Sequence, residues 1–177
     1  KYNENIYNCL SSLKDNNYLI ACCSNSITKT ITKSLEKIKI LDFFDLILSN
    51  EDVLKGKPHP EMYWKAMSAF GVYPENTMII EDSPHGLKAA SSSGAHVYRV
   101  KNPRDIVFKN IINNIKNFEA NNKMTIPIWT DKKLNILIKN KLNASVKDLS
   151  SFGVLFLFLF DCLAQKLFLF QSYHLMN

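Results

Sequence analysis

Four short apolar runs alternate with helix-forming segments across the first hundred residues, and this alternation limits the fold more than any other feature. The runs are Tyr18–Cys23, Phe44–Ser49, Asn76–Asp82 and Ala95–Val100. Between them, apolar residues recur at helical spacing, as in residues 27–38. A continuously apolar run such as Tyr18–Cys23 is typical of a strand that is buried on both faces. The pattern therefore predicts an α/β fold with a mostly parallel sheet.

Polar residues follow these runs at the point where each strand is expected to end. Ser24 and Asn25 come directly after the first run, and Glu81 and Asp82 end the third. Lys57 lies in the loop that leaves the second run. Because ligands bind at the carboxyl ends of parallel strands, we expect these side chains to share one edge of the sheet.

This mixture of groups suits phosphoryl chemistry. A hydroxyl such as that of Ser24 and backbone N–H groups can hold phosphate oxygens, and a lysine such as Lys57 offsets their negative charge. Carboxylates such as Glu81 and Asp82 are ligands that Mg²⁺ prefers. Each group also has a purely structural interpretation when taken alone, for example Ser24 as a helix cap and the acidic pair as a cap of the following helix.

Three motifs, in order along the chain, resemble those of the haloacid dehalogenase (HAD) superfamily. The branch is that of β-phosphoglucomutase-like and phosphoglycolate-phosphatase-like proteins. The segment YLIACCSN resembles the second family motif at Ser24, and GKPHPEMYWKAM resembles the third at Lys57. EDSPHGLKAASSSG resembles the fourth at Glu81, Asp82, Ser83, Gly86 and Gly94. The resemblance covers roughly residues 2–100.

The resemblance implies a Rossmann-like, three-layer fold and a Mg²⁺-dependent phosphatase or phosphomutase. The implied substrate is a small phosphorylated metabolite such as a sugar phosphate. By resemblance, Ser24 and Lys57 are catalytic, and both bind the substrate phosphate together with Asn25. Glu81 and Asp82 would hold Mg²⁺, with Asp82 as the nearer ligand. In the family, an aspartate attacks the phosphoryl group, and a second aspartate two residues on acts as acid and base.

The first family motif, an apolar strand that ends in Asp-x-Asp, has no counterpart in this sequence. The nearest imitation is FLFLFDCL, where Asp161 follows an apolar run but Leu163 stands two residues on. Its position late in the chain leads us to interpret it as coincidence. The sequence begins at about the helix that precedes the second motif. We therefore expect a partial core that lacks the first strand and the cap, with marginal stability and no catalysis by these residues alone.

The chain divides, on this interpretation, into a partial core over residues 1–118, a linker over 119–133 and a poorly defined apolar tail over 134–177. Within the tail, Ser151–Phe170 has about the length of a membrane span, but Asp161, Gln165 and Lys166 interrupt it. We therefore expect no membrane anchor.

Two alternative functions stay open. One is a catalytically inactive HAD-like module that binds a partner or a phosphorylated ligand. The other is the N-terminal part of a bifunctional enzyme, because KLNILI resembles the first strand of a sugar-phosphate nucleotidyltransferase. No glycine-rich loop follows that segment in the sequence.

Composition adds limits on partners and location. The net charge is +6, but the basic residues are scattered without a run of five, so we expect no nucleic-acid partner. The four cysteines form no CxxC pair and no zinc-type spacing. We interpret them as reduced core residues of a cytoplasmic protein. The sequence leaves the oligomeric state open.

Overall fold

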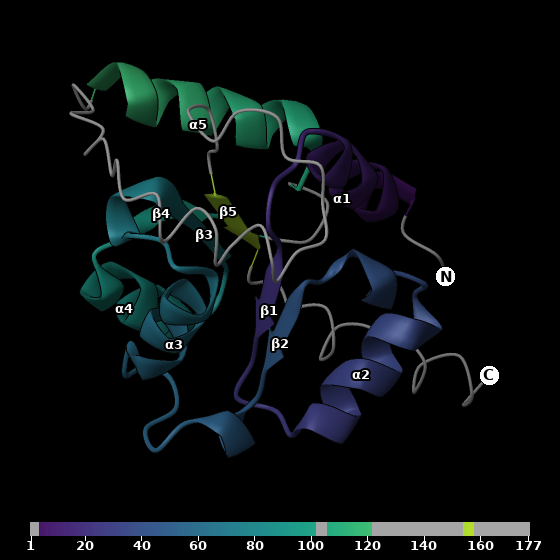
Figure 1. Ribbon diagram of the computed structural model, residues 1–177, viewed down its shortest axis with the longest axis vertical. Helices are drawn as coiled ribbons and strands as arrows, with labels where there is room; N and C mark the ends of the chain where they lie inside the picture. Colours follow the sequence, from purple (N-terminus) through teal and green to yellow (C-terminus); the bar gives the residue numbers. More distant parts are fainter. Residues whose placement is uncertain (1–3, 102–105, 122–153, 158–177) are drawn as a thin grey trace, which may run out of the picture.

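The computed structural model describes residues 4–101, 106–121 and 154–157, and its strands are all parallel (Figure 1). One sheet pairs β1 (Ala21–Cys23) with β2 (Leu46–Leu48). The second sheet has the order β4-β3-β5, with the bounds His96–Arg99, Thr77–Glu81 and Val154–Leu157. Four of these strands lie within the predicted apolar runs. The prediction of an α/β fold with a parallel sheet is therefore confirmed.

The described residues contain five helices, and one of them lies within residues 27–38, where the apolar spacing predicts a helix. Their bounds are α1 (Glu4–Asp15), α2 (Thr28–Lys37), α3 (Glu61–Phe70), α4 (Pro84–Ser93) and α5 (Phe108–Asn121). Three short 3-10 turns, η1 (Leu41–Phe43), η2 (Asn50–Asp52) and η3 (Pro74–Asn76), lie in the connections. Helices α3 and α4 end at Gly71 and Gly94, whose φ angles of 66° and 85° are left-handed. Glycine adopts this conformation without the strain that a Cβ atom would cause.

The strands separate two hydrophobic cores. The first core joins α1, α2 and α5 to one face of the strands, where Cys22 and Ile80 point. The second joins α3 and α4 to the other face, where Cys23 and Ile79 point. Because successive side chains of a strand face opposite sides, a strand between two helical layers must be apolar throughout. The molecule therefore has the three layers that the resemblance implied.

Three of the cysteines lie in these cores. Cys9, Cys22 and Cys23 are buried and form no disulfide. Burial raises the pKa of the Cys9 thiol to about 12 and raises that of Cys23 well above its ordinary value. The interpretation of these thiols as reduced core residues is confirmed for this part of the chain; Cys162 lies outside the described residues.

The carboxyl ends of β1 and β3 are held firmly in the sheet. The Ser24 N–H donates to the Leu48 carbonyl at 3.0 Å, which extends the pairing of β1 with β2. The Val100 N–H donates to the Glu81 carbonyl at 3.0 Å and extends the pairing of β3 with β4 in the same way. Hydrogen bonds of this kind place the predicted site residues on fixed backbone.

The strand β5 was not foreseen, because it comes from the segment that the sequence suggested was a poorly defined tail. It pairs with β3 in parallel, from Thr77 opposite Val154 to Ile80 opposite Leu157. The predicted linker, the rest of the tail and Asp161 lie outside the described residues. None of the helices in the described part of the chain is long and apolar enough to span a membrane.

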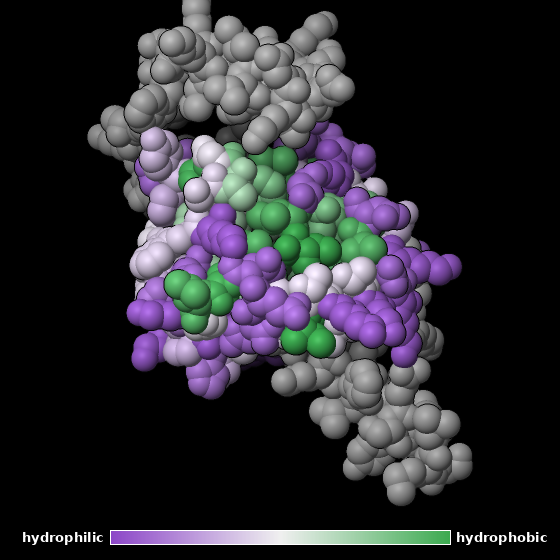
Figure 2. All heavy atoms as spheres, turned by 60° about the horizontal axis from the view of Figure 1, so that its bottom comes forward, coloured by the Kyte–Doolittle hydropathy of each residue, from purple (hydrophilic) through white to green (hydrophobic). Residues whose placement is uncertain are grey.

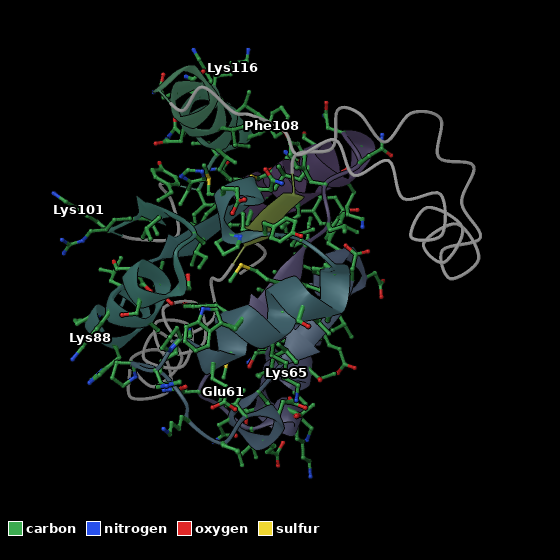
Figure 3. The ribbon with its side chains drawn as sticks, turned by 60° about the vertical axis from the view of Figure 1, so that its left-hand side comes forward. Glu61, Lys65, Lys88, Lys101, Phe108 and Lys116 are labelled. Carbon is green, nitrogen blue, oxygen red and sulfur yellow. The ribbon has the colours of Figure 1, made fainter. Side chains whose placement is uncertain are left out.

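The surface carries apolar and charged groups in separate places. Figure 2 shows one side of the molecule, on which hydrophilic residues border hydrophobic areas. Among the described residues, Leu54 is the most exposed large apolar side chain, with 97% of its surface accessible. Lys88, Lys101 and Lys116 project in different directions from α4, from the end of β4 and from α5 (Figure 3). This spacing agrees with the scattered charge seen in the sequence.

Candidate functional site

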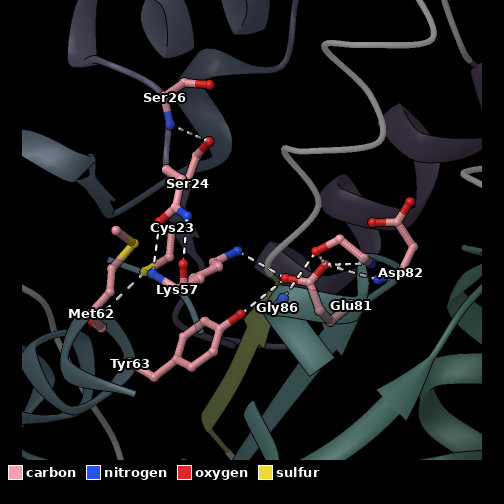
Figure 4. Close-up of polar contacts among 11 residues, drawn as sticks. Cys23, Ser24, Ser26, Lys57, Met62, Tyr63, Glu81, Asp82 and Gly86 are labelled. Atoms are coloured by element: carbon pink, nitrogen blue, oxygen red, sulfur yellow. Dashed lines mark hydrogen bonds and ion pairs between the residues drawn. The ribbon is translucent and has the colours of Figure 1, made fainter. Parts of the chain in front are cut away.

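A buried ion pair joins two of the predicted site residues. Lys57 Nζ lies 2.8 Å from Glu81 Oε2, and both side chains are 1% exposed (Figure 4). Lys57 comes from the loop between η2 and α3, and Glu81 is the last residue of β3. The two residues are 24 positions apart in the sequence. The structure therefore brings them together as the sequence predicted.

The Glu81 carboxylate is surrounded by donors on both oxygens. Oε2 also accepts from the Tyr63 hydroxyl at 3.0 Å. Oε1 accepts from the N–H groups of Asp82 and Ser83 at 2.9 and 3.0 Å, and from the Ser83 hydroxyl at 3.0 Å. A buried carboxylate is costly unless it is paired and hydrogen-bonded, and here protein groups supply both the ion pair and the hydrogen bonds.

Tyr63 is a site residue that the sequence analysis missed. Its ring is buried in the second core, where it packs with other residues of α3. Its hydroxyl nevertheless contacts Glu81, and Lys57 Nζ lies 5.3 Å from the centre of its ring. The one signal for this contact in the sequence is that Tyr63 lies six residues after Lys57, on the helix that follows the loop.

Electrostatics favour a charged pair. Burial raises the pKa of the Glu81 carboxyl, but the charge and hydrogen bond of Lys57 lower it, as do the N–H groups of Ser83 and Asp82. The lowering effects prevail, so the pKa lies below its ordinary value. Glu81 is therefore a carboxylate at neutral pH, and it balances the charge of Lys57.

Gly86 leaves the space that the Glu81 carboxylate fills. A Cβ atom added at Gly86 would lie 2.0 Å from Glu81 Oε2, far inside van der Waals contact. Gly86 lies in the first turn of α4, where its N–H donates to the Ser83 hydroxyl at 3.1 Å. Ser83 thereby caps α4, a role that the sequence analysis had considered for the acidic pair.

Ser24 is fully buried at the end of β1. Its hydroxyl oxygen accepts from the Ser26 N–H at 3.1 Å, which closes a tight turn towards α2 (Figure 4). The predicted role of Ser24 in phosphate binding stays a prediction.

Asn25 makes a contact that the sequence did not suggest. Its side chain donates to the Lys57 carbonyl at 2.9 Å and accepts from the Lys57 N–H at 2.9 Å. The amide thus pairs with the backbone of Lys57 as a neighbouring strand would. Both polar atoms of the Asn25 side chain therefore form hydrogen bonds with the backbone of Lys57. The predicted contact of Asn25 with a phosphate stays a prediction.

Helix α3 holds the same loop from the other side. Glu61 accepts from the N–H groups of Leu54 and Lys55 at 2.7 and 3.0 Å. Lys65, one turn further along α3, donates to the Asp52 carbonyl. Helix α3 therefore holds the first part of the loop, and Asn25 holds the backbone of Lys57.

Asp82 is the half-buried carboxylate next to the pair, directly after β3. Among the described residues, no group of three or more His, Cys, Asp or Glu side chains is arranged to hold a metal ion. Mg²⁺ commonly uses one or two carboxylates and completes its shell with waters and phosphate oxygens, so a single carboxylate at this edge is compatible with it. Because both Glu81 oxygens already accept from protein donors, Asp82 is the better candidate ligand of the two.

A parallel α/β sheet with polar groups at its carboxyl edge defines a class of protein that binds its ligands there. A model of the haloacid dehalogenase-like hydrolase family matches residues 1–100, more than half of the 177 residues. The chain belongs to this family, and the family resemblance seen in the sequence is confirmed.

Curated relatives carry phosphatase names. Pyrophosphatase PpaX of Bacillus cereus is 29% identical over 91 residues, which cover 51% of this chain and 42% of that protein. Phosphoglycolate phosphatase of Nitrosococcus oceani is 31% identical over 88 residues, covering 50% of this chain and 39% of that protein. The chain therefore spans less than half the length of these relatives.

Solved structures share the fold. β-Phosphoglucomutase from Clostridium difficile superposes with a TM-score of 0.58 at 24% identity, over 66% of this chain and 57% of that chain. A predicted phosphoglycolate phosphatase from Haemophilus somnus gives a TM-score of 0.54 at 26% identity, over 64% and 56%. The first likeness shows the fold alone.

Proposed function

We propose that this edge of the sheet is a phosphoryl-transfer site. The chain would act, with Mg²⁺, as a phosphatase or phosphomutase on a small phosphorylated metabolite such as a sugar phosphate. The observation that carries the proposal is the buried Lys57–Glu81 pair beside Ser24 and Asp82. The phosphatase and phosphomutase names of the relatives support the same reaction class.

Each residue has a distinct task in this proposal. The Ser24 hydroxyl and the N–H groups of the turn after β1 would bind phosphate oxygens. The Lys57 ammonium would offset the charge that develops on those oxygens. Glu81 would hold Lys57 in place and keep it protonated, while Asp82 would hold Mg²⁺. When bound, the ion would neutralise charge on the phosphate oxygens.

The test compares phosphate binding by variants of the full chain. Binding of inorganic phosphate is measured by calorimetry with and without Mg²⁺. We expect Ser24→Ala to weaken binding by about tenfold, the equivalent of one lost hydrogen bond. We expect Asp82→Asn to remove the effect of Mg²⁺. Ser34→Ala, a serine on α2 whose hydroxyl donates to the Thr30 carbonyl within the same helix, is the matched control. Equal phosphate binding by Ser24→Ala and Ser34→Ala would contradict the proposal.

A second candidate function is a phosphate-binding module without turnover. The sequence favours it in one respect, because its 177 residues contain no Asp-x-Asp motif. Turnover separates the two functions. Mg²⁺-dependent hydrolysis of any ester in a phosphate-ester panel, abolished by Asp82→Asn, supports the enzyme. Phosphate binding that depends on Ser24 without hydrolysis of any ester supports the binding module.

A further inference from the structure

His59 contacts the loop that carries Lys57 at two points. The His59 N–H donates to the Gly56 carbonyl at 3.0 Å, so a turn encloses the backbone of Lys57. The imidazole Nδ1 accepts from the N–H of Glu61, the first residue of α3, at 3.2 Å. An N–H group in the first turn of a helix has no partner within the helix, so the imidazole acts as a cap of α3. This contact requires the neutral imidazole, because both ring nitrogens of a protonated histidine are donors.

The Glu61 carboxylate lies against the same imidazole. Its Oε2 is 4.0 Å from His59 Nδ1 and accepts from the Lys55 N–H at 3.0 Å. Its Oε1 accepts from the Leu54 N–H at 2.7 Å. The oxygen beside Nδ1 is therefore the one that holds Lys55 in place. A proton on Nδ1 turns this nitrogen from an acceptor into a donor, and Oε2 is an acceptor that it can reach.

Glu61 is the charged partner of the imidazole among the described residues. Trp64 on α3 lies edge-on to the imidazole, with ring centroids 5.7 Å apart, and its indole N–H donates to the last carbonyl of α4. Of the lysines in these elements, Lys57 is directed to the carboxylate at the end of β3, and Lys65 donates to the last carbonyl of η2. The side chain of Lys55 is exposed. The imidazole is itself 38% exposed, so protons reach it from solvent.

We propose that the His59 imidazole and the Glu61 carboxylate form a pH-sensitive latch on the loop that carries Lys57. The neutral imidazole caps α3 and leaves the carboxylate to hold the loop. On protonation the cap is lost, a positive charge faces the N-terminus of α3, and Nδ1 competes with the Lys55 N–H for Oε2. All three effects loosen the loop as the pH falls from about 8 to about 5, the range in which histidine ordinarily changes its charge. The latch does not depend on which ligand the site binds.

NMR spectroscopy of the full chain tests the latch. The amide signals of Lys55 and Glu61 and the ring signal of His59 are followed from about pH 8 to about pH 5.5, above the range in which carboxylates ordinarily titrate. We expect both amide signals to shift with the midpoint of the His59 ring. We also expect the protection of the Lys55 amide against exchange, relative to an unstructured amide, to fall by about threefold or more. The Leu54 amide should lose less protection, because its acceptor is the other oxygen.

Two histidine variants separate the latch from a general effect of acid. In His59→Asn, the amide oxygen can accept the N–H group two residues on and does not titrate, so we expect the Lys55 amide to be equally protected at both pH values. His85→Asn is the matched control, because His85 is an exposed histidine in the first turn of α4, and it should respond to pH as the natural chain does. A pH response that survives in His59→Asn, or Lys55 and Glu61 signals that do not follow the His59 midpoint, would overturn the proposal.

Discussion

At the scale of single residues, the site depends on how a buried carboxylate is compensated. Glu81 accepts two hydrogen bonds at one oxygen, from Lys57 and Tyr63, and three at the other, from Asp82 and Ser83. The like charge of the adjacent Asp82 is tolerated because Glu81 is directed into the core towards Lys57, while Asp82 stays half-buried at the edge. Neighbouring carboxylates thus have different surroundings.

Gly86→Ala tests how tightly this arrangement is packed. The added methyl group would overlap Glu81 Oε2, so the carboxylate must move away from Lys57. We expect the free energy of unfolding to fall by about 2–3 kcal/mol, as for an overpacked core site. Urea denaturation measures the change. Ser92→Ala, at an exposed position of the same helix, is the control and should change stability by less than about 0.5 kcal/mol. A Gly86→Ala variant as stable as the control would show that Glu81 relaxes without cost.

At the scale of elements, the decisive unit is the loop between η2 and α3. It has no regular secondary structure around Lys57, yet it places the Lys57 side chain against the buried Glu81 carboxylate. Asn25 holds its backbone from the end of β1, and Glu61 and Lys65 hold it from α3. Contacts with two other elements therefore help to fix the conformation of the loop, together with its own hydrogen bond from the His59 N–H to the Gly56 carbonyl at 3.0 Å.

Asn25→Ala should loosen this loop. The Lys57 N–H loses its acceptor, so we expect its amide exchange, followed by NMR, to become about tenfold faster, as the loss of about 1.4 kcal/mol would produce. Asn25→Asp keeps an acceptor oxygen for the Lys57 N–H, although it replaces the donor to the Lys57 carbonyl with a charged oxygen. We therefore expect it to retain most of the protection at Lys57. Unchanged exchange in Asn25→Ala would mean that α3 alone holds the loop.

At the scale of the whole molecule, the Lys57–Glu81 pair links the loop to the sheet and makes stability depend on pH. The folded-state pKa of Glu81 lies below its ordinary value of about 4.3. Its contribution to stability is therefore present above that value and is lost as the pH falls from there towards the folded-state pKa. Acid should weaken the folded protein through this residue.

Glu81→Gln provides the measurement. At pH 7 we expect the variant to be less stable than the natural chain by about 3 kcal/mol, because Lys57 keeps a buried charge without its counter-ion. Below about pH 4 the difference should shrink, as the carboxyl of the natural chain becomes protonated. Glu36→Gln, at an exposed position of α2, should stay within about 0.5 kcal/mol of the natural chain at each pH. A constant difference for Glu81→Gln from pH 7 to pH 3 would contradict the assigned ion pair.

The sequence by itself determined the local structure and most of the candidate site. Apolar runs predict four of the strands, and helical spacing predicts the helix within residues 27–38, because burial on one or both faces produces a periodic pattern of apolar residues. Ser24, Lys57 and Glu81 were identifiable because each follows a strand or lies in a motif. These are local signals that neighbouring residues carry.

Only the tertiary structure decided which distant residues meet. The contact of Tyr63 with Glu81 and that of Asn25 with Lys57 join elements whose spacing in the sequence does not specify their orientation. The pairing of Val154–Leu157 with β3 joins segments more than 70 residues apart, between Ile80 and Leu157 for example. An apolar run has the same pattern whichever strand it pairs with, because burial requires hydrophobic residues but does not specify the neighbouring strand. The neighbour of a strand is determined by which sheet edges and helix faces remain unpaired when the rest of the chain has folded.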